Sequence, residues 1–299
     1  MTRSVAWTVV LVALAAASLV APASAQLQDN LGALTGDNAK GYLGPLPKAL
    51  SGTLNAAIFH SGDVPKTGVN FTIGVRLMGV TFDDADRLYR PSDPPGFSST
   101  GPVDAPTIIG DTQAVQQSGQ GGTTLYHPGG FDIGEFALAV PELQFGSVAG
   151  TRAVVRWISL DLGDSDFGKL SLFGIGAQHS ISQYFEKLPL DLAGGFLYQT
   201  FKIDDNLVDT KAFHINVTGS KRFGVFQPYV GVGFDNFKMD AEYEDSTSPG
   251  GQKIGVDFDA ESNMHLTLGG MLDFPVVKIN GELNVAATNG VAVGLSFGR

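Results

Sequence analysis

The sequence predicts an all-β protein, a closed antiparallel transmembrane β-barrel of about 10–12 strands with a short N-terminal helical or plug segment. The first observation is composition, because 39 glycines and 20 phenylalanines stand beside few long runs of Ala, Leu, Glu or Lys. The second is a repeated alternation of apolar and polar residues. The third is that tight turns alternate with longer polar connections along the chain, a pattern typical of barrels that cross a membrane.

The first 25 residues are typical of a secretory signal peptide. Arg3 precedes an apolar run over 9–17, and the small residues Ala23 and Ala25 occupy the positions that a signal peptidase recognises. The run is too short to cross a bilayer of about 30 Å as a helix. We therefore expect residues 1–25 to be cleaved and the mature chain to be exported.

Charge and cysteine content narrow the function classes. Without the signal, 18 basic residues face 30 acidic ones, a net charge of −12, so we expect no nucleic-acid partner. The chain has no cysteine, hence neither disulfides nor a lipid-modified cysteine. After the signal no apolar run exceeds the five residues of 136–140, so no transmembrane helix is expected.

The N-terminal segment 26–66 differs from the remainder, 67–299, which is the expected barrel. Pro45 and Pro47 interrupt a short helix or turn in this segment, and TLNAAIF at 53–59 is a candidate strand. The segment is expected either to plug the lumen or to add strands and raise the total to twelve.

Ten segments of the barrel region are expected to be strands, comparable to the roughly 9–11 residues that cross a bilayer at a tilt. In AFHINVTGS, 212–220, Phe213, Ile215 and Val217 alternate with His214 and Asn216. In KLSLFGIGAQ, 169–178, Leu170 and Leu172 point to one face of the strand and Phe173 and Ile175 to the other, so we assign neither face to lipid. The expected strands are 68–82, 137–146, 151–160, 168–178, 190–203, 211–221, 227–240, 254–273, 276–286 and 290–297.

The alternating faces fit a membrane barrel better than a soluble sandwich, because the polar partners are mostly small or uncharged and aromatic residues cluster near strand ends. The apolar face is then expected on lipid and the polar face in the lumen. The lumen charges either line a pore that selects solutes or pair with one another and fill a narrow barrel. The lumen-lining candidates are Arg76, Arg152, Arg156, His214, Asn216, His265, Lys278 and Glu282.

The chain end GVAVGLSFGR places Val293, Leu295 and Phe297 on one face, and it resembles the carboxy-terminal strand of bacterial outer-membrane proteins. That resemblance implies outer-membrane lipid and the barrel-assembly machinery as partners. The stretches 172–199 and 41–57 resemble an uncharacterised family of bacterial outer-membrane proteins distantly similar to long-chain fatty-acid transporters. The resemblance implies an outer-membrane location and brings no catalytic or ligand motif.

The orientation of the chain end also predicts a topology. If Phe297 ends its strand on the periplasmic side, the connections 161–166, 204–210, 244–252 and the long loop 83–135 lie outside the cell. Loop 83–135 is rich in Pro, Gly, Ser and Gln, and we expect it to fold over or into the pore mouth.

No enzyme is expected. The sequence contains neither a phosphate-binding glycine loop nor a Gly-x-Ser-x-Gly elbow, and the neighbours His60-Ser61 and His179-Ser180 would point to opposite faces of a strand. Acidic clusters at Asp83-Asp84-Asp86, Asp161-Asp164-Asp166 and Asp204-Asp205 lack EF-hand spacing, so we expect no metal site and no cofactor.

The sequence therefore predicts a pore or transporter for small molecules, with hydrophobic molecules as one candidate class of solute. Two alternatives stay open. One is a structural or adhesive outer-membrane barrel without transport, and the other is a soluble periplasmic barrel that binds an apolar ligand inside.

Overall fold

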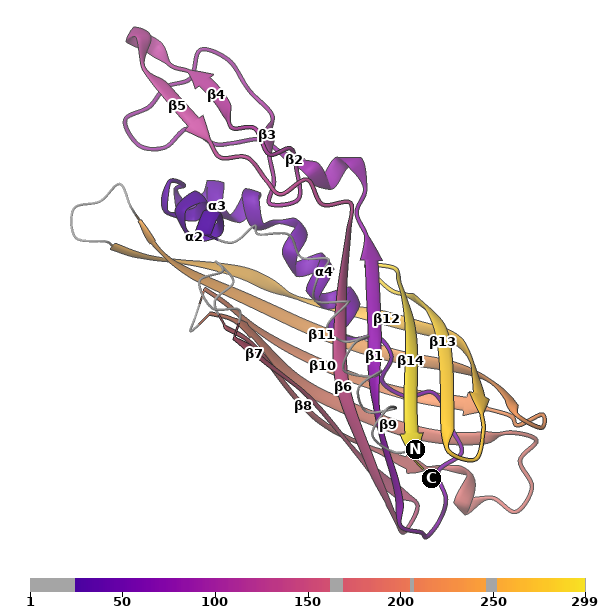
Figure 1. Ribbon diagram of the computed structural model, residues 1–299. Coiled ribbons are helices and arrows are strands. Elements are labelled where there is room, and N and C mark those ends of the chain that lie inside the picture. Colours follow the sequence, from indigo (N-terminus) through magenta and orange to yellow (C-terminus); the bar gives the residue numbers. More distant parts are fainter. Residues whose placement is uncertain (1–24, 162–168, 205–206, 246–251, 299) are drawn as a thin grey trace, which may run out of the picture.

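The computed structural model describes residues 25–161, 169–204, 207–245 and 252–298 (Figure 1). The predicted signal peptide, apart from Ala25, lies outside these residues, as do most of the acidic connections 161–166 and 244–252. No helix among the described residues is long and apolar enough to cross a membrane.

Ten antiparallel strands close into one barrel, in the order β1-β14-β13-β12-β11-β10-β9-β8-β7-β6. Each corresponds to one of the ten expected strands, so the predicted fold class is confirmed. Closure occurs where β1 pairs with both β6 and β14, so each barrel strand has a neighbour on both sides, although β6 over 135–141 and β12 over 252–265 extend past β7 and β13. The strands are β1 Asn70–Thr81, β6 Glu135–Val148, β7 Thr151–Asp161, β8 Lys169–Ser180, β9 Asp191–Ile203, β10 Val208–Ser220, β11 Phe226–Asp245, β12 Gln252–Asp273, β13 Val277–Val285 and β14 Gly290–Gly298.

Apolar side chains point out of the barrel. On β10, Phe213, Ile215 and Val217 are 37%, 48% and 46% exposed, whereas His214 and Asn216 are buried in the lumen. This confirms the predicted faces of AFHINVTGS, and it is the arrangement of a membrane-spanning barrel. A soluble barrel with its apolar faces inside, one of the alternatives above, has the opposite arrangement and is wrong.

The conflict of parities on β8 is explained by the lumen itself. Phe173 and Ile175 face outward at 57% and 52% exposure, whereas Leu172 is buried inside. Leu172 belongs to a part of the lumen that is packed with apolar residues rather than polar ones. Around Leu172 both faces of this strand are therefore apolar, and the alternation is lost there, whereas Gln178 and Ser180 farther along face inward and are polar.

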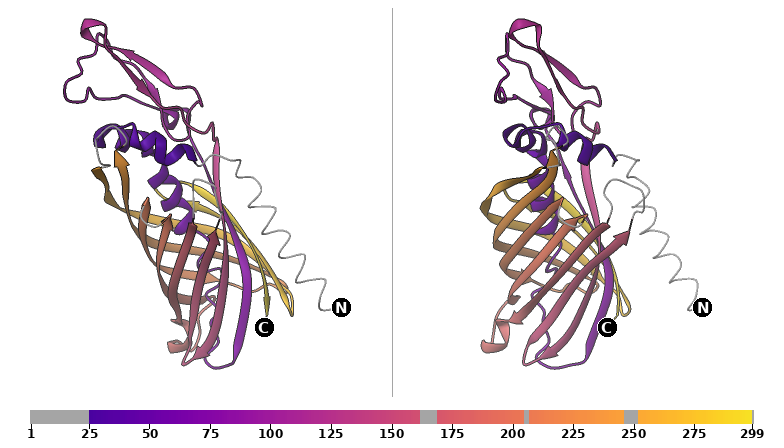
Figure 2. Two further views of the ribbon diagram at one scale, coloured as in Figure 1. Left: turned by 60° about the vertical axis from the view of Figure 1, so that its left-hand side comes forward. Right: turned by 90° about the vertical axis from the view of Figure 1, so that its left-hand side faces the viewer.

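Three helices occupy one mouth of the barrel, and the last of them descends into the lumen (Figure 2). They are α2 Ala25–Gly32, α3 Gly36–Leu43 and α4 Pro45–Leu54. Pro45 begins α4, where a missing N–H costs no hydrogen bond. The extra strand expected at 53–59 is wrong, because Thr53 and Leu54 end α4 and the residues that follow to 59 form no strand.

Loop 83–135 forms a lobe beyond the same mouth (Figure 1). It contains two small hairpins, β2 Leu88–Tyr89 with β3 Ala105–Pro106, and β4 Val115–Ser118 with β5 Thr124–His127. The 3-10 turns are η1 Asp84–Arg87 and η2 Gln120–Gly122 in this lobe, and η3 Ser182–Tyr184 at the opposite end of the barrel.

The lobe packs onto the helices. The backbone N–H of Ile108 donates to the carbonyl of Tyr42 at 2.8 Å. The hydroxyl of Tyr42 donates to the carbonyl of Gly129 at 3.0 Å and accepts from the Asn30 amide at 3.0 Å. Burial raises the pKa of Tyr42 to about 12, against the opposing effect of Asn30, so the phenol keeps the proton that it donates. The loop thus covers the mouth, as expected, but does so from outside the lumen.

Candidate functional site in the barrel lumen

The lumen has an apolar half and a polar half. Towards the helices, apolar residues of α2, α3 and α4 pack against apolar residues that face inward from the barrel wall. The wall side of this apolar half includes Met78, Leu138, Val140, Ile158, Leu172, Phe201 and Met239. Beyond the end of α4 the inward residues are charged or hydrogen-bonding, and the candidate site lies in this polar half.

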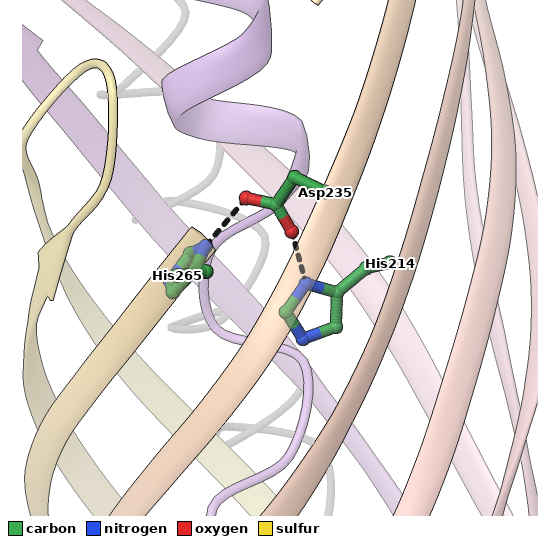
Figure 3. A group of neighbouring side chains, drawn as sticks. All are labelled: His214, Asp235 and His265. Atoms are coloured by element: carbon green, nitrogen blue, oxygen red, sulfur yellow. Dashed lines mark hydrogen bonds and ion pairs between the residues drawn. The ribbon is translucent and has the colours of Figure 1, made fainter. Parts of the chain in front are cut away.

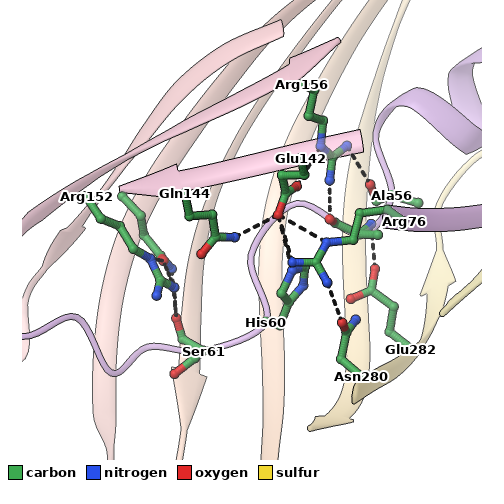
Figure 4. Close-up of polar contacts among 12 residues, drawn as sticks. Ala56, His60, Ser61, Arg76, Glu142, Gln144, Arg152, Arg156, Asn280 and Glu282 are labelled. Atoms are coloured by element: carbon green, nitrogen blue, oxygen red, sulfur yellow. Dashed lines mark hydrogen bonds and ion pairs between the residues drawn. The ribbon is translucent and has the colours of Figure 1, made fainter. Parts of the chain in front are cut away.

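Two arginines share one carboxylate at the centre of the polar half (Figure 4). Arg76 donates to Oε1 of Glu142 from Nε at 3.1 Å and from Nη2 at 2.8 Å, and Arg156 donates from Nε to Oε2 at 2.8 Å. All three side chains are at most 2% exposed. Charge-assisted bonds of this kind are needed, because an unpaired buried charge is costly.

The chain that follows α4 runs through the polar half and is held there by wall side chains. Arg156 donates to the carbonyl oxygens of Ala56, at 3.1 Å, and Ala57. The N–H of Ala57 donates to Oε1 of Glu282 at 2.7 Å. Further along, the carbonyl of Ser61 accepts from Arg152 at 3.1 Å. The lumen charges therefore bind the plug segment as well as one another.

A second polar cluster lies on β10, β11 and β12 (Figure 3). Nδ1 of His214 lies 2.5 Å from Oδ1 of Asp235, and Nδ1 of His265 lies 2.6 Å from Oδ2 of the same carboxylate. His214 and Asp235 are direct cross-strand partners. All three residues are 2–3% exposed.

A cavity of about 160 Å³ lies at the end of the lumen opposite the helices. Its lining includes His60, Arg76, Arg152 and Lys278. Among the described residues the two ring nitrogens of His60 have no hydrogen-bond partner, and Nε2 lies 3.7 Å from Oε1 of Glu142. The cavity is the polar vestibule of this mouth.

The eight lumen-lining candidates do not form one site. Arg76 and Arg156 meet at Glu142, His214 and His265 meet at Asp235, and the other four residues have different direct partners. Lys278 is at the rim, 3.7 Å from Asp273, and Asn216 donates to the hydroxyl of Thr218 at 3.1 Å. Arg152 donates to Gln178, and Glu282 accepts from the hydroxyl of Tyr229 at 2.8 Å.

Sequence reasoning missed the two carboxylates that organise the clusters. Asp235 has the inward parity of PYVGVGFDNF, since Val230, Val232 and Phe234 face outward, so that strand pattern contained the signal. Glu142 follows the apolar run 136–140 and Pro141, and no alternation marks its face.

The two His-Ser neighbours lie in different settings. His60 and Ser61 are in the chain segment inside the lumen and not on a strand, whereas His179 and Ser180 end β8. Nδ1 of His179 contacts the hydroxyl of Thr151 at 2.7 Å rather than that of Ser180.

Comparison with known proteins identifies the family. The profile of a family of unknown function (DUF6588) matches residues 2–299, so the chain belongs to that family, which agrees with the resemblance to an uncharacterised family. No curated protein sequence matches the chain.

Solved structures similar to this chain are bacterial barrels at low similarity. The attachment invasion locus protein Ail of Yersinia pestis is 10% identical, with 78% of this chain and 97% of that chain covered and a TM-score of 0.25. The toluene transporter TbuX of Ralstonia pickettii is 8% identical, with 80% and 90% covered and a TM-score of 0.28. The outer-membrane protein OmpT of Vibrio cholerae is 10% identical, with 79% and 100% covered and a TM-score of 0.25.

Proposed function

We propose that this member of the family is an integral outer-membrane β-barrel that admits small apolar molecules when its N-terminal helices move in the lumen. The outward apolar side chains support the membrane location, and the secretory signal predicted from the sequence supports export. The proposal assigns the barrel no catalytic activity.

The apolar half of the lumen is the observation that carries the proposal. A wall with inward-facing Met78, Val140 and Phe201 would line an apolar passage once α4 is displaced. In the described conformation the same wall packs against α4, so the barrel is closed and needs a movement of the plug to conduct. The plug is covalently part of the chain, and one segment can therefore close and reopen the passage.

A reversible disulfide tests this movement, and the cysteine-free chain suits the design. A Cβ placed on Gly52 of α4 would lie 3.3 Å from Cβ of Thr288, near the spacing of a disulfide, once the neighbouring methyl of Val80 gives way. Cells that carry Gly52→Cys with Thr288→Cys are assayed for uptake of an apolar fluorescent dye, before and after addition of a reductant.

We expect uptake to be low while the disulfide is closed and to rise to the wild-type level on reduction. Each single cysteine variant is the control and is expected to be insensitive to the reductant. Equal uptake in the closed and reduced states, with the disulfide verified by gel mobility, would show that α4 does not gate the barrel.

The proposed orientation places the lobe outside the cell. Protease added to intact cells should then cut between Arg87 and Gln120 and spare the turn 222–226. Cleavage only after the outer membrane is breached would reverse this orientation. Assembly by the barrel-assembly machinery through Val293, Leu295 and Phe297 is part of the same proposal, because it sets the direction of β14.

A structural or adhesive role is the second candidate, and the folded lobe favours it. The lobe stands beyond the barrel wall with its own two hairpins (Figure 1). Removal of 90–104 should abolish attachment to a surface if the lobe is the adhesive part, whereas dye uptake would stay unchanged.

A further inference from the structure

Three side chains of the kinds that ligate transition metals converge on one point of the inner wall (Figure 3). One ligand atom from each of His214, Asp235 and His265 lies within 4.8 Å of the others. The three residues come from the adjacent strands β10, β11 and β12, so the rigid sheet positions them. Two imidazoles and one carboxylate are a common protein ligand set for Zn²⁺.

The surroundings of His265 match those of a metal ligand. Its Nε2 lies 2.8 Å from Oδ1 of Asn284, which also accepts from the hydroxyl of Thr267 at 3.0 Å. The Asn284 amide is oriented by its own donation to Oε1 of Glu282 at 2.9 Å. Nε2 of His265 must therefore donate, and Nδ1 is left for the centre of the cluster. Histidines that ligate metals donate their other ring N–H to an acceptor in this way.

The buried negative charge of Asp235 favours a cation at the centre of the cluster. The carboxylate of Asp235 faces two ring nitrogens and has no arginine or lysine within ion-pair distance in the described chain. Glu282 is a further buried carboxylate joined to the cluster through Asn284. It lies beside Arg156 at Ala57, and Arg156 supplies its positive neighbour. A cation at the cluster would balance the charge of Asp235, and protons on the imidazoles are the competing occupants.

We propose that His214, Asp235 and His265 bind one Zn²⁺ ion inside the barrel wall. Ligand atoms around tetrahedral zinc lie about 3.3 Å apart at bond lengths of about 2.0–2.1 Å. The two N···O distances of 2.5 and 2.6 Å would therefore widen by less than about 1 Å, and any ligand pair at the 4.8 Å limit of the cluster would shorten by about 1.5 Å, changes that rotations of the three side chains supply. The ion would link three strands of the barrel, a role independent of the proposed transport.

Metal content tests the proposal on the full-length protein, purified from membranes in detergent without a polyhistidine tag. The protein is stripped with a chelator, incubated with ZnCl₂ and desalted, and zinc per chain is measured by mass spectrometry. We expect about one zinc per wild-type chain, and at least a tenfold weaker affinity in His214→Gln and in His265→Gln. His179→Gln, at the end of β8 and outside the cluster, is the matched control and should keep the zinc.

Heat-modifiable migration on a gel verifies that each variant is folded. Incubation of the wild type with Co²⁺ gives a readout that needs no variant, since tetrahedral nitrogen and oxygen ligation produces intense visible absorption bands. Zinc retained by the folded double variant His214→Gln/His265→Gln would overturn the proposal. A stripped wild-type protein that takes up no zinc and shows no Co²⁺ bands would overturn it as well.

Discussion

Replacing Glu142 by Gln tests whether the polar half of the lumen is a dry, charge-paired interior. The carboxylate accepts three bonds from Arg76 and Arg156 and a fourth from Gln144 at 2.8 Å, and it is 1% exposed. Glutamine has nearly the same shape but no charge, so both guanidiniums lose their shared counter-charge. Removing one partner of a buried ion pair costs about 3–5 kcal/mol.

The structure places the expected cost of this substitution at the lower end of that range. Arg76 keeps a bond from Nη1 to Oδ1 of Asn280 at 2.7 Å, and Arg156 keeps the carbonyls of Ala56 and Ala57. We therefore expect the free energy of unfolding to fall by about 3 kcal/mol, which is about a hundredfold in the folding equilibrium.

Equilibrium unfolding in urea, with refolding into lipid vesicles, measures this loss. Glu186→Gln, at an exposed position of the turn 181–190, is the control and should change the free energy by less than about 0.5 kcal/mol. Adding Arg76→Gln to Glu142→Gln removes one of the two guanidiniums that have lost their counter-charge. The free energy of unfolding of the double variant should therefore fall by less than the sum of the losses of the two single variants. A loss of under about 1 kcal/mol for Glu142→Gln would refute the dry interior, because water or a counter-ion must then reach the guanidiniums.

Three further predictions follow from other parts of the molecule. Ile215→Lys puts a charge on the outer face and should cost about 2–4 kcal/mol in vesicles, whereas Ile215→Val should cost less than half of that; equal losses would argue against lipid at this position. Gly195→Ala should destabilise the barrel by about 1–3 kcal/mol in urea, because its Cβ would lie 2.5 Å from the Phe59 ring, while Gly194→Ala, whose Cβ has 3.6 Å of clearance, should not. Burial lowers the pKa of His127, so the unfolded lobe binds the proton more readily and the lobe loses stability as the pH falls below about 6.5. Proteolysis of 115–127 should therefore be faster at acid pH, and His127→Gln should remove that dependence.

The strands were predictable because their signal is local and redundant. A period of two survives the replacement of any one residue, and the outward positions are apolar along β13 and over 213–217 of β10, whereas Asp209 and Lys211 face outward nearer the helix-filled mouth. The signal fails where the environment changes along the lumen, as on β8, whose inward Leu172 meets apolar neighbours and not polar ones. The alternation therefore shows which face points outward only where the lipid side and the lumen side of the strand differ in polarity.

The helical segment was less predictable, because its helices are short and contain Gly and Pro. Helix α3 includes Gly41, and α4 includes Pro45, Pro47 and Gly52. Such helices have weak intrinsic propensity and are stabilised by packing inside the barrel. The periodicity of the segment itself could not distinguish a plug from additional strands. Whether the segment joins the sheet depends on how the remaining strands close the barrel.

The pairing of the lumen charges follows from the size of the barrel. Ten strands enclose a narrow interior, and a narrow interior must be filled by side chains or by another segment of the chain. Arg76 and Arg156 meet this requirement with Glu142, and Arg156 and Glu282 also bind the plug segment at Ala57. Movement of α4 alone would leave these bonds intact, because they lie beyond its end at Leu54. Opening the whole passage must break the bonds at Ala57, so the polar half opposes opening more strongly than the apolar half does. Substitutions in the Glu142 network are therefore expected to destabilise the closed state.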